Sequence, residues 1–260
     1  MTAFWCRMLC VLAVGMVCPN LCGAQATDES THKSLDGYLG AGPMVLPKYA
    51  GSADSETKLE PIAMIEYKET AYIYLNRVGV RLWGSPDKKM ALGIAAEPRF
   101  GFKVGDGERL AGMSTRRDAI EGGPAFEWEL PWFSLSAAYF TDWSNTSGSQ
   151  SWRLSVDRQL VDKGRWDIST YLDLDRADAS IVQYYFGVRP DEATATRPSY
   201  QPGATVMSDL GLFSAYKLNK NYALLFGGQL NYLGRAAADS PIVQRRSGLV
   251  AYLGLGLVFK

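Results

Sequence analysis

The chain offers few residues whose types and spacing could perform chemistry. Asp173, Asp175 and Asp178 form an acidic cluster that could bind a cation. A calcium loop needs a glycine for its sharp turn and a closing glutamate at its twelfth position. This run has no such glycine, and Tyr184 stands twelfth when counted from Asp173. We therefore expect these carboxylates to face the interior or the rim of the fold, and we predict no metal site.

Nucleophilic and cofactor chemistry have still less support. The single histidine, His32, stands in a polar stretch near the N-terminus, so no imidazole can act as a base for a serine in the rest of the chain. The glycines of Gly105-Asp-Gly107 and Gly112 lack the spacing of a dinucleotide fingerprint. The four cysteines all stand near the N-terminus: Cys6, Cys10, Cys18 and Cys22. We predict no catalytic residue and no cofactor.

The first 26 residues are typical of a secretory signal peptide. Arg7 precedes an apolar run over 8–17, and Ala24-Gln25-Ala26 fits a signal-peptidase site, so cleavage is expected between Ala26 and Thr27. A retained helix is one alternative, but the run is shorter than the roughly 20 residues that span a bilayer. Lipidation at Cys22 is another alternative, although no small residue directly precedes that cysteine.

The composition of the remaining chain limits the possible partners. Without residues 1–26 the chain loses one basic residue and no acidic one, which leaves 26 basic and 27 acidic residues. This near-neutral balance argues against nucleic acid as a partner. Hydrophobic residues make up 47% of the whole chain, yet no stretch approaches the length of a membrane-spanning helix.

The elements that carry these residues are predicted to be strands, because apolar residues alternate with small or polar ones. In the last segment one face would carry Leu249, Ala251, Leu253, Leu255, Leu257 and Phe259. The recurrence of such faces indicates strands whose outer side meets lipid, hence an all-β, antiparallel transmembrane β-barrel. Ten strands are predicted: 58–68, 72–83, 91–103, 119–130, 132–143, 151–161, 166–175, 206–217, 222–233 and 247–259.

Connection lengths support this topology, because outer-membrane barrels have short periplasmic turns and long outside loops. Lys68-Glu-Thr70 is too short for the outside loop that ten strands require. Adding 36–45 and 181–189 gives a twelve-strand alternative. In the ten-strand arrangement 27–57 precedes or joins a barrel of 58–260, and 177–205 lies outside or folds into the lumen.

Charged residues on the polar faces should point into the lumen. They include Arg77, Arg81, Glu97, Arg99, Lys103, Glu121, Glu127, Glu129, Arg153, Asp157, Asp167 and Asp173. In a narrow barrel, side chains of both signs are expected to fill the interior with ion pairs. The alternative is a slender solute channel. Aromatic residues such as Trp152 and Trp166 cluster toward strand ends, which favours interfacial girdles over β-propensity alone.

Three sets of motifs follow one another along the chain. They are Gly40-Ala-Gly42 with Pro47-Lys-Tyr49-Ala-Gly51-Ser52, then Tyr184-Tyr-Phe-Gly-Val188 with Glu192-Ala193 and Tyr200, then Ala237-Ala-Asp-Ser-Pro-Ile-Val243. With these motifs the chain resembles the MltA-interacting protein (MipA)/OmpV family of Gram-negative outer-membrane proteins, over essentially the whole length after the signal peptide.

The resemblance implies location in the outer membrane, with outer-membrane lipid as its surroundings. It also implies an envelope scaffold or interaction protein, because the founding member is named for linking a lytic transglycosylase to a peptidoglycan synthase. A periplasmic murein hydrolase or synthase is therefore the expected partner. A narrow channel or small-ligand barrel is the alternative, and a hydrolase ranks last. We expect a functional loop, either a plug or a binding surface, at Tyr184, Tyr185, Phe186, Gly187 and Tyr200.

Overall fold

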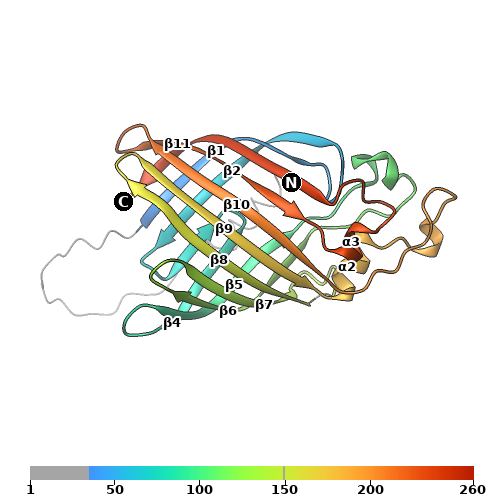
Figure 1. Cartoon of the computed structure of the whole chain (residues 1–260), viewed down its shortest axis with the longest axis horizontal. Coiled ribbons are helices and arrows are strands. Elements are labelled where there is room, and N and C mark those ends of the chain that lie inside the picture. Colours follow the sequence, from blue (N-terminus) through green and yellow to red (C-terminus); the bar gives the residue numbers. More distant parts are fainter. Residues whose placement is uncertain (1–34, 149) are drawn as a thin grey trace, which may run out of the picture. The chain divides into compact units, whose positions relative to one another are not determined.

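Twelve antiparallel strands close into a barrel in the computed structural model, which describes residues 35–148 and 150–260 (Figure 1). Each strand pairs with its neighbours in the sequence, and the first pairs with the last. The strands are β1 (Leu35–Pro47), β2 (Ser55–Tyr67), β3 (Ala71–Tyr74), β4 (Arg77–Gly84), β5 (Met90–Arg99), β6 (Ala119–Glu129), β7 (Ser134–Asp142), β8 (Gln150–Lys163), β9 (Trp166–Ala177), β10 (Thr205–Lys217), β11 (Tyr222–Tyr232) and β12 (Ser247–Phe259).

The barrel has twelve strands, the alternative count, and not ten. One of the two additional strands is not the one that the alternative added. The segment 36–45 is indeed a strand, within β1. The second extra strand arises because the segment 72–83 folds into a hairpin, β3 and β4, with its turn at Leu75 and Asn76. Lys68-Glu-Thr70 thereby becomes a periplasmic turn, which suits its short length.

The strand over 181–189 that the twelve-strand alternative added does not form, and 178–204 is a connection outside the wall, as the ten-strand arrangement expected. Residues Ala179–Phe186 form the helix α2 instead. Asp178 caps this helix, because its carboxylate accepts a hydrogen bond of 2.9 Å from the backbone N–H of Ile181. The buried residues Ile181, Val182, Tyr185 and Phe186 recur at helical spacing and face a core of loops.

The two ends of the barrel differ in the lengths of their connections. The short turns 68–70, 85–89, 130–133, 164–165 and 218–221 lie at the end that holds the C-terminus. The long connections 48–54, 100–118, 178–204 and 233–246 lie at the other end, with α2 and the short helix α3 (Arg235–Ala238) (Figure 1). Short 3₁₀ turns at Val104–Asp106, Glu108–Leu110 and Pro190–Glu192 belong to the long loops. The first end is therefore periplasmic and the second faces outside.

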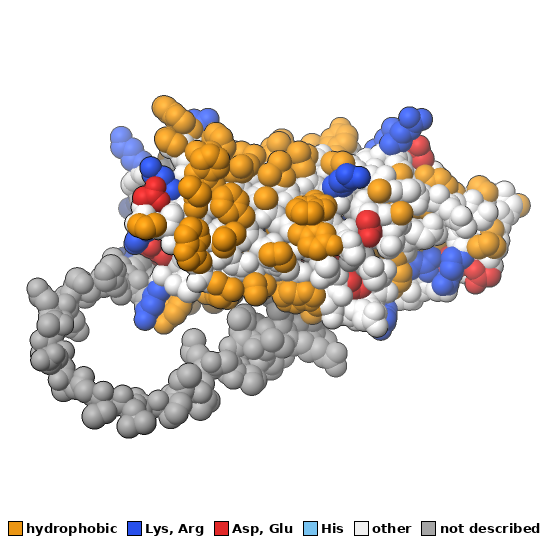
Figure 2. All heavy atoms as spheres, turned by 90° about the horizontal axis from the view of Figure 1, so that it is seen from below, with side chains coloured by type: hydrophobic (Ala, Val, Ile, Leu, Met, Phe, Trp, Pro, Cys, Tyr) orange, Lys and Arg blue, Asp and Glu red, His pale blue; other side chains and the backbone are white. Residues whose placement is uncertain are grey.

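The outer face of the barrel wall is apolar, as the alternation predicted. Figure 2 shows hydrophobic side chains spread over the wall, with charged side chains concentrated toward the ends. On β12, Leu255 is 55% exposed whereas Tyr252 is 7% exposed. A Cβ at Gly254 would lie 2.7 Å from Ile62 Cδ1 inside the barrel, so this glycine faces inward. The predicted register of β12 is confirmed.

The predicted signal peptide, with cleavage between Ala26 and Thr27, lies outside the described residues. Among the residues that are described, no helix is long and apolar enough to cross a membrane.

Candidate functional site

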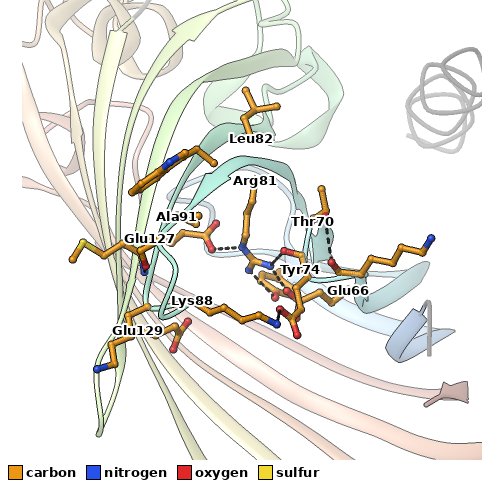
Figure 3. A pocket seen from close by; sticks show the side chains of 16 residues that line it. Glu66, Thr70, Tyr74, Arg81, Leu82, Lys88, Ala91, Glu127 and Glu129 are labelled. Carbon is orange, nitrogen blue, oxygen red and sulfur yellow. Dashed lines mark hydrogen bonds and ion pairs between the residues drawn. The ribbon is translucent and has the colours of Figure 1, made fainter. Parts of the chain in front are cut away.

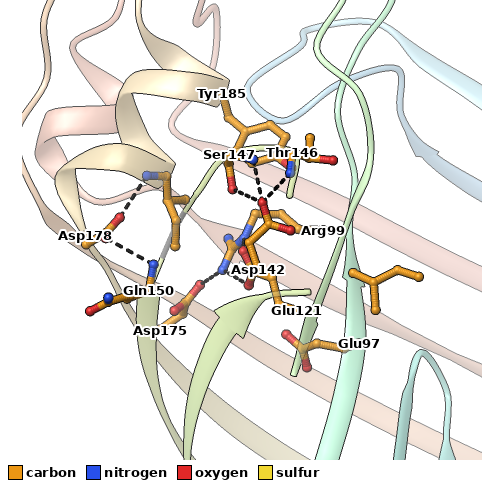
Figure 4. A network of polar contacts seen from close by, with 12 residues as sticks. Glu97, Arg99, Glu121, Asp142, Thr146, Ser147, Gln150, Asp175, Asp178 and Tyr185 are labelled. Atoms are coloured by element: carbon orange, nitrogen blue, oxygen red, sulfur yellow. Dashed lines mark hydrogen bonds and ion pairs between the residues drawn. The ribbon is translucent and has the colours of Figure 1, made fainter. Parts of the chain in front are cut away.

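The lumen near the outside end contains a cluster of arginines and carboxylates, of which Figure 4 shows Arg99 with Glu121 and Asp175. Arg99 on β5 donates two hydrogen bonds to the neighbouring Glu121, of 2.7 and 2.9 Å. Its Nη2 also donates to Asp175 on β9, at 2.7 Å. Asp175 accepts a further bond of 3.0 Å from Arg153. All four side chains are largely buried, and each charge has an opposite charge beside it.

A second part of this network runs across the barrel below the first. Arg77 on β4 donates to Glu97 at 3.1 Å and lies 3.7 Å from Asp173 on β9. Arg153 also forms an ion pair with Glu97 and so joins the two parts. Strands β4 and β9 are five positions apart in a ring of twelve, which places them nearly opposite each other. The Arg77–Asp173 pair therefore spans the lumen.

The other side of the lumen is apolar. Its buried residues are Tyr38, Ile62, Phe213, Ala215, Ala223, Leu225 and Tyr252, from β1, β2, β10, β11 and β12. The Tyr38 hydroxyl donates a hydrogen bond of 2.9 Å to Asp167, four strands away on β9, and so also crosses the interior.

The prediction that side chains of both signs occupy the lumen is confirmed for most of the charged residues named from the sequence.

The outside mouth is covered by an outer cap, a cluster of loop residues that pack together. Its members include Leu110, Ile181, Val188 and Ile242, all with no exposed surface. They come from the connections 100–118, 178–204 and 233–246, which are far apart in the sequence. Because these side chains have no exposed surface, the core of the outer cap excludes water.

The five residues of the predicted functional loop lie in or beside the outer cap. Tyr185 and Phe186 are buried in it, at 5% and 4% exposure. The carbonyl of Tyr184 accepts a bond of 2.7 Å from Arg116, and the Tyr200 hydroxyl donates to the Ala236 carbonyl at 2.9 Å. Gly187 follows Phe186 as the C-cap of α2. These contacts hold loops together, and a binding role for the segment stays a prediction.

A buried ion pair inside the outer cap escaped the sequence analysis. The Arg116 guanidinium donates two hydrogen bonds to Glu192, of 2.9 and 2.7 Å, and the side chains are 5% and 2% exposed. Burial raises the pKa of Glu192, but the bonds from Arg116 and from the backbone N–H groups of Ser114 and Arg189 together lower it to about 2. The only signal in the sequence was the place of Glu192 in a family motif.

The acidic cluster of the sequence is divided between two places. Asp173 and Asp175 meet arginines in the lumen, whereas Asp178 caps α2 at the rim. Across residues 35–148 and 150–260, no three His, Cys, Asp or Glu side chains lie together as metal ligands would.

A hollow of about 430 Å³ opens at the periplasmic end, between β2, β4, β5 and β6 (Figure 3). Arg81 lies at its centre, donating to Glu127 at 2.7 Å and pairing with Glu66. At its rim Lys88 and Glu69 form an exposed ion pair of 2.8 Å. The hollow thus presents charges of both signs to the periplasm, which suits a polar surface of another protein.

Solved barrels give a distant likeness. The toluene transporter TbuX of Ralstonia pickettii is 11% identical with a TM-score of 0.37, and the match covers 88% of this chain and 90% of that one. Outer membrane phospholipase A of Escherichia coli is 12% identical with a TM-score of 0.34, over 90% and 94% of the two chains.

Sequence relatives are closer. Outer membrane protein Omp26La of Vibrio anguillarum is 31% identical over 136 residues, 52% of each chain. Outer membrane protein OmpV of Vibrio cholerae is 31% identical over 84 residues, 32% of this chain and 33% of OmpV. The chain thus spans about half or less of the curated relatives it matches. The model of the family described as MltA-interacting protein MipA matches residues 39–259, nearly the whole barrel. This chain therefore belongs to the MltA-interacting protein MipA family and is a β-barrel protein of the outer membrane.

Proposed function

We propose that this barrel is an envelope scaffold that binds a periplasmic murein hydrolase or synthase, and that it is not an open pore. The observation that supports this most is the Arg77–Asp173 pair, which spans the lumen beneath an outer cap of packed loops. A wide aqueous path through the barrel would require both the ion pair and the outer cap to be displaced. The family name, which refers to interaction with MltA, supports a partner of the murein-processing class.

The docking surface of this proposal is the periplasmic hollow around Arg81. Its rim carries Lys88, Lys89 and Glu69, whose side chains are more than half exposed. Exposed charges of both signs steer a complementary partner and make its binding sensitive to salt. The proposal gives no residue a catalytic role.

A binding measurement with matched variants tests the scaffold. Full-length barrel in detergent micelles is titrated with a purified MltA-type lytic transglycosylase. The double variant Lys88→Glu/Lys89→Glu should weaken binding by about tenfold or more, which corresponds to about 1.4 kcal/mol. The control, Arg245→Glu/Arg246→Glu, reverses two adjacent charges in the outside loop 233–246 and should bind as the wild type does. Absence of binding by the wild type, or an equal loss in both variants, would contradict the proposal.

The competing function, a narrow channel, is tested separately. Wild-type protein in a planar bilayer should show no stable open-pore conductance, because ion pairs and the outer cap obstruct the lumen. A steady conductance of the wild type would favour the channel.

A further inference from the structure

A row of four side chains crosses the outward face of the wall near its outside rim. Tyr139 on β7 is the cross-strand partner of Trp152 on β8, which is the partner of Arg176 on β9. Arg176 is in turn the partner of Val206 on β10. Three of these residues, Tyr139, Trp152 and Arg176, line a hollow of about 290 Å³ on this surface. The row is not part of the lumen, the outer cap or the periplasmic hollow.

The position of Arg176 along β9 fixes its height in the membrane. Trp166 and Arg176 both face outward on this strand and are separated by ten residues. At about 3.3 Å per residue and a tilt of about 40°, this separation is about 25 Å along the membrane normal, the height of the apolar band of such barrels. Trp166 lies at the periplasmic end of β9, so Arg176 lies at the opposite interface, among the headgroups of the outer leaflet.

In the described part of the chain, no carboxylate forms an ion pair with Arg176. Within residues 35–148 and 150–260 its guanidinium takes part in none of the ion pairs or hydrogen bonds that stabilise the other rim residues. Asp178 lines the same hollow but forms no ion pair with Arg176, and its two oxygens instead accept bonds from the backbone N–H groups of Gln150 and Ile181, at 3.0 and 2.9 Å. An exposed, unpaired guanidinium at the level of the headgroups suits an anionic group of a lipid headgroup. Phosphate fits the planar N–H donors of the guanidinium best.

The neighbours of Arg176 extend the match beyond a phosphate. The rings of Tyr139 and Trp152 lie 4.8 Å apart, and Trp152 is 61% exposed, so it offers a flat face on which a sugar ring can pack. One step toward the membrane centre, Leu154 and Leu174 form the next cross-strand pair and are exposed to lipid. Phosphate, sugar and acyl chain would thus meet a cation, an aromatic face and an aliphatic surface in that order.

We propose that this row binds a phosphorylated glycolipid of the outer leaflet, the lipid A part of lipopolysaccharide. The Arg176 guanidinium binds a lipid A phosphate, the indole of Trp152 packs against the glucosamine ring, and Leu154 and Leu174 contact the acyl chains. The site would anchor the barrel laterally among lipopolysaccharide molecules, independently of any periplasmic partner.

The test compares two outward-facing arginines. Wild-type, Arg176→Gln and Arg158→Gln proteins are refolded in detergent, checked for heat-modifiable migration, and mixed with lipid A, with phosphatidylglycerol or with inorganic phosphate. Arg158 lies on β8 toward the periplasmic end and serves as the control. Lipid molecules retained on each barrel are counted by native mass spectrometry.

Arg176→Gln should reduce lipid A retention by about tenfold, the effect of losing one charge-assisted contact of about 1.4 kcal/mol, and Arg158→Gln should leave it unchanged. Wild type should retain lipid A well above phosphatidylglycerol or free phosphate. Trp152→Leu, which keeps the charge, should also lower lipid A retention. Equal retention by Arg176→Gln and wild type, or equal retention of phosphatidylglycerol and lipid A, would overturn the proposal.

Discussion

At the scale of single residues, the alternation on β12 separates lipid-facing from lumen-facing positions. Leu255 is exposed on the outward face, near the middle of the strand. A Leu255→Arg change should cost about 2–4 kcal/mol, because it places a charge near the bilayer midplane. The free energy of unfolding in lipid vesicles measures this cost. If Leu255→Arg folded as stably as wild type while Tyr252→Arg did not, the register of β12 would be wrong by one residue.

The Arg116–Glu192 pair allows a prediction at the same scale. Replacing Arg116 by Met should destabilise the outer cap by about 1–3 kcal/mol, because it removes two charge-assisted hydrogen bonds from buried Glu192 and leaves the half-exposed Arg189 as its remaining ion-pair partner. The barrel strands do not contain either residue, so heat-modifiable migration should persist. Protease cleavage in the loops 100–118 and 178–204 measures the loosening. Cleavage no faster than in wild type would show that the pair does not hold these loops.

Acid should weaken the same pair. The pKa of Glu192 is lowered from 4.5 to about 2, so its contribution to stability is fully present above about pH 4.5 and is lost as the pH falls to about 2. Pepsin should therefore cut the outer loops much faster at pH 2 than at pH 4. Glu192→Gln should remove most of this pH dependence, and an unchanged dependence in that variant would assign it to another group.

At the scale of elements, α2 belongs to the outer cap and not to the barrel wall. Deleting 180–200 should therefore leave a folded, heat-modifiable barrel, since Ala177 and Thr205 already pair at the ends of β9 and β10. The remaining loops 100–118 and 233–246 should lose protection, because they pack against α2 in one core. Hydrogen exchange of the deletion variant measures both effects. Failure of the variant to fold would mean that the segment is needed to build the wall.

At the scale of the whole molecule, the lumen network decides whether ions can pass. The double change Arg77→Gln/Arg99→Gln removes the two arginines that reach β9 from β4 and β5. Combined with deletion of 180–200, it should open a conductance that favours cations, because the carboxylates Asp173 and Asp175 remain. Planar-bilayer recording with a salt gradient measures the selectivity. Anion selectivity, or the same conductance from the loop deletion alone, would contradict this account of the network.

The strands were predictable because their information is local. Alternation places Leu253 and Leu255 on one face whatever the partner strand is, and turn lengths give the direction of each crossing. The charged residues of the lumen could be predicted from the same alternation. Arg99, Glu121 and Asp173 lie on the face of their strands opposite to the apolar face. Fold class and much of the interior were therefore determined by the sequence itself.

Tertiary structure decided what periodicity could not. Residues 181–189 suit either a strand or a helix by composition, and the Asp178 cap together with a buried loop core selects the helix. The hairpin turn at Leu75 and Asn76 is set by pairing with β2 and β5, so twelve strands form where local pattern gave ten. Arg116 meets Glu192, 76 residues away, only because closure of the barrel brings their loops to the same end. Contacts between distant residues depend on the closed ring, which short-range pattern does not encode.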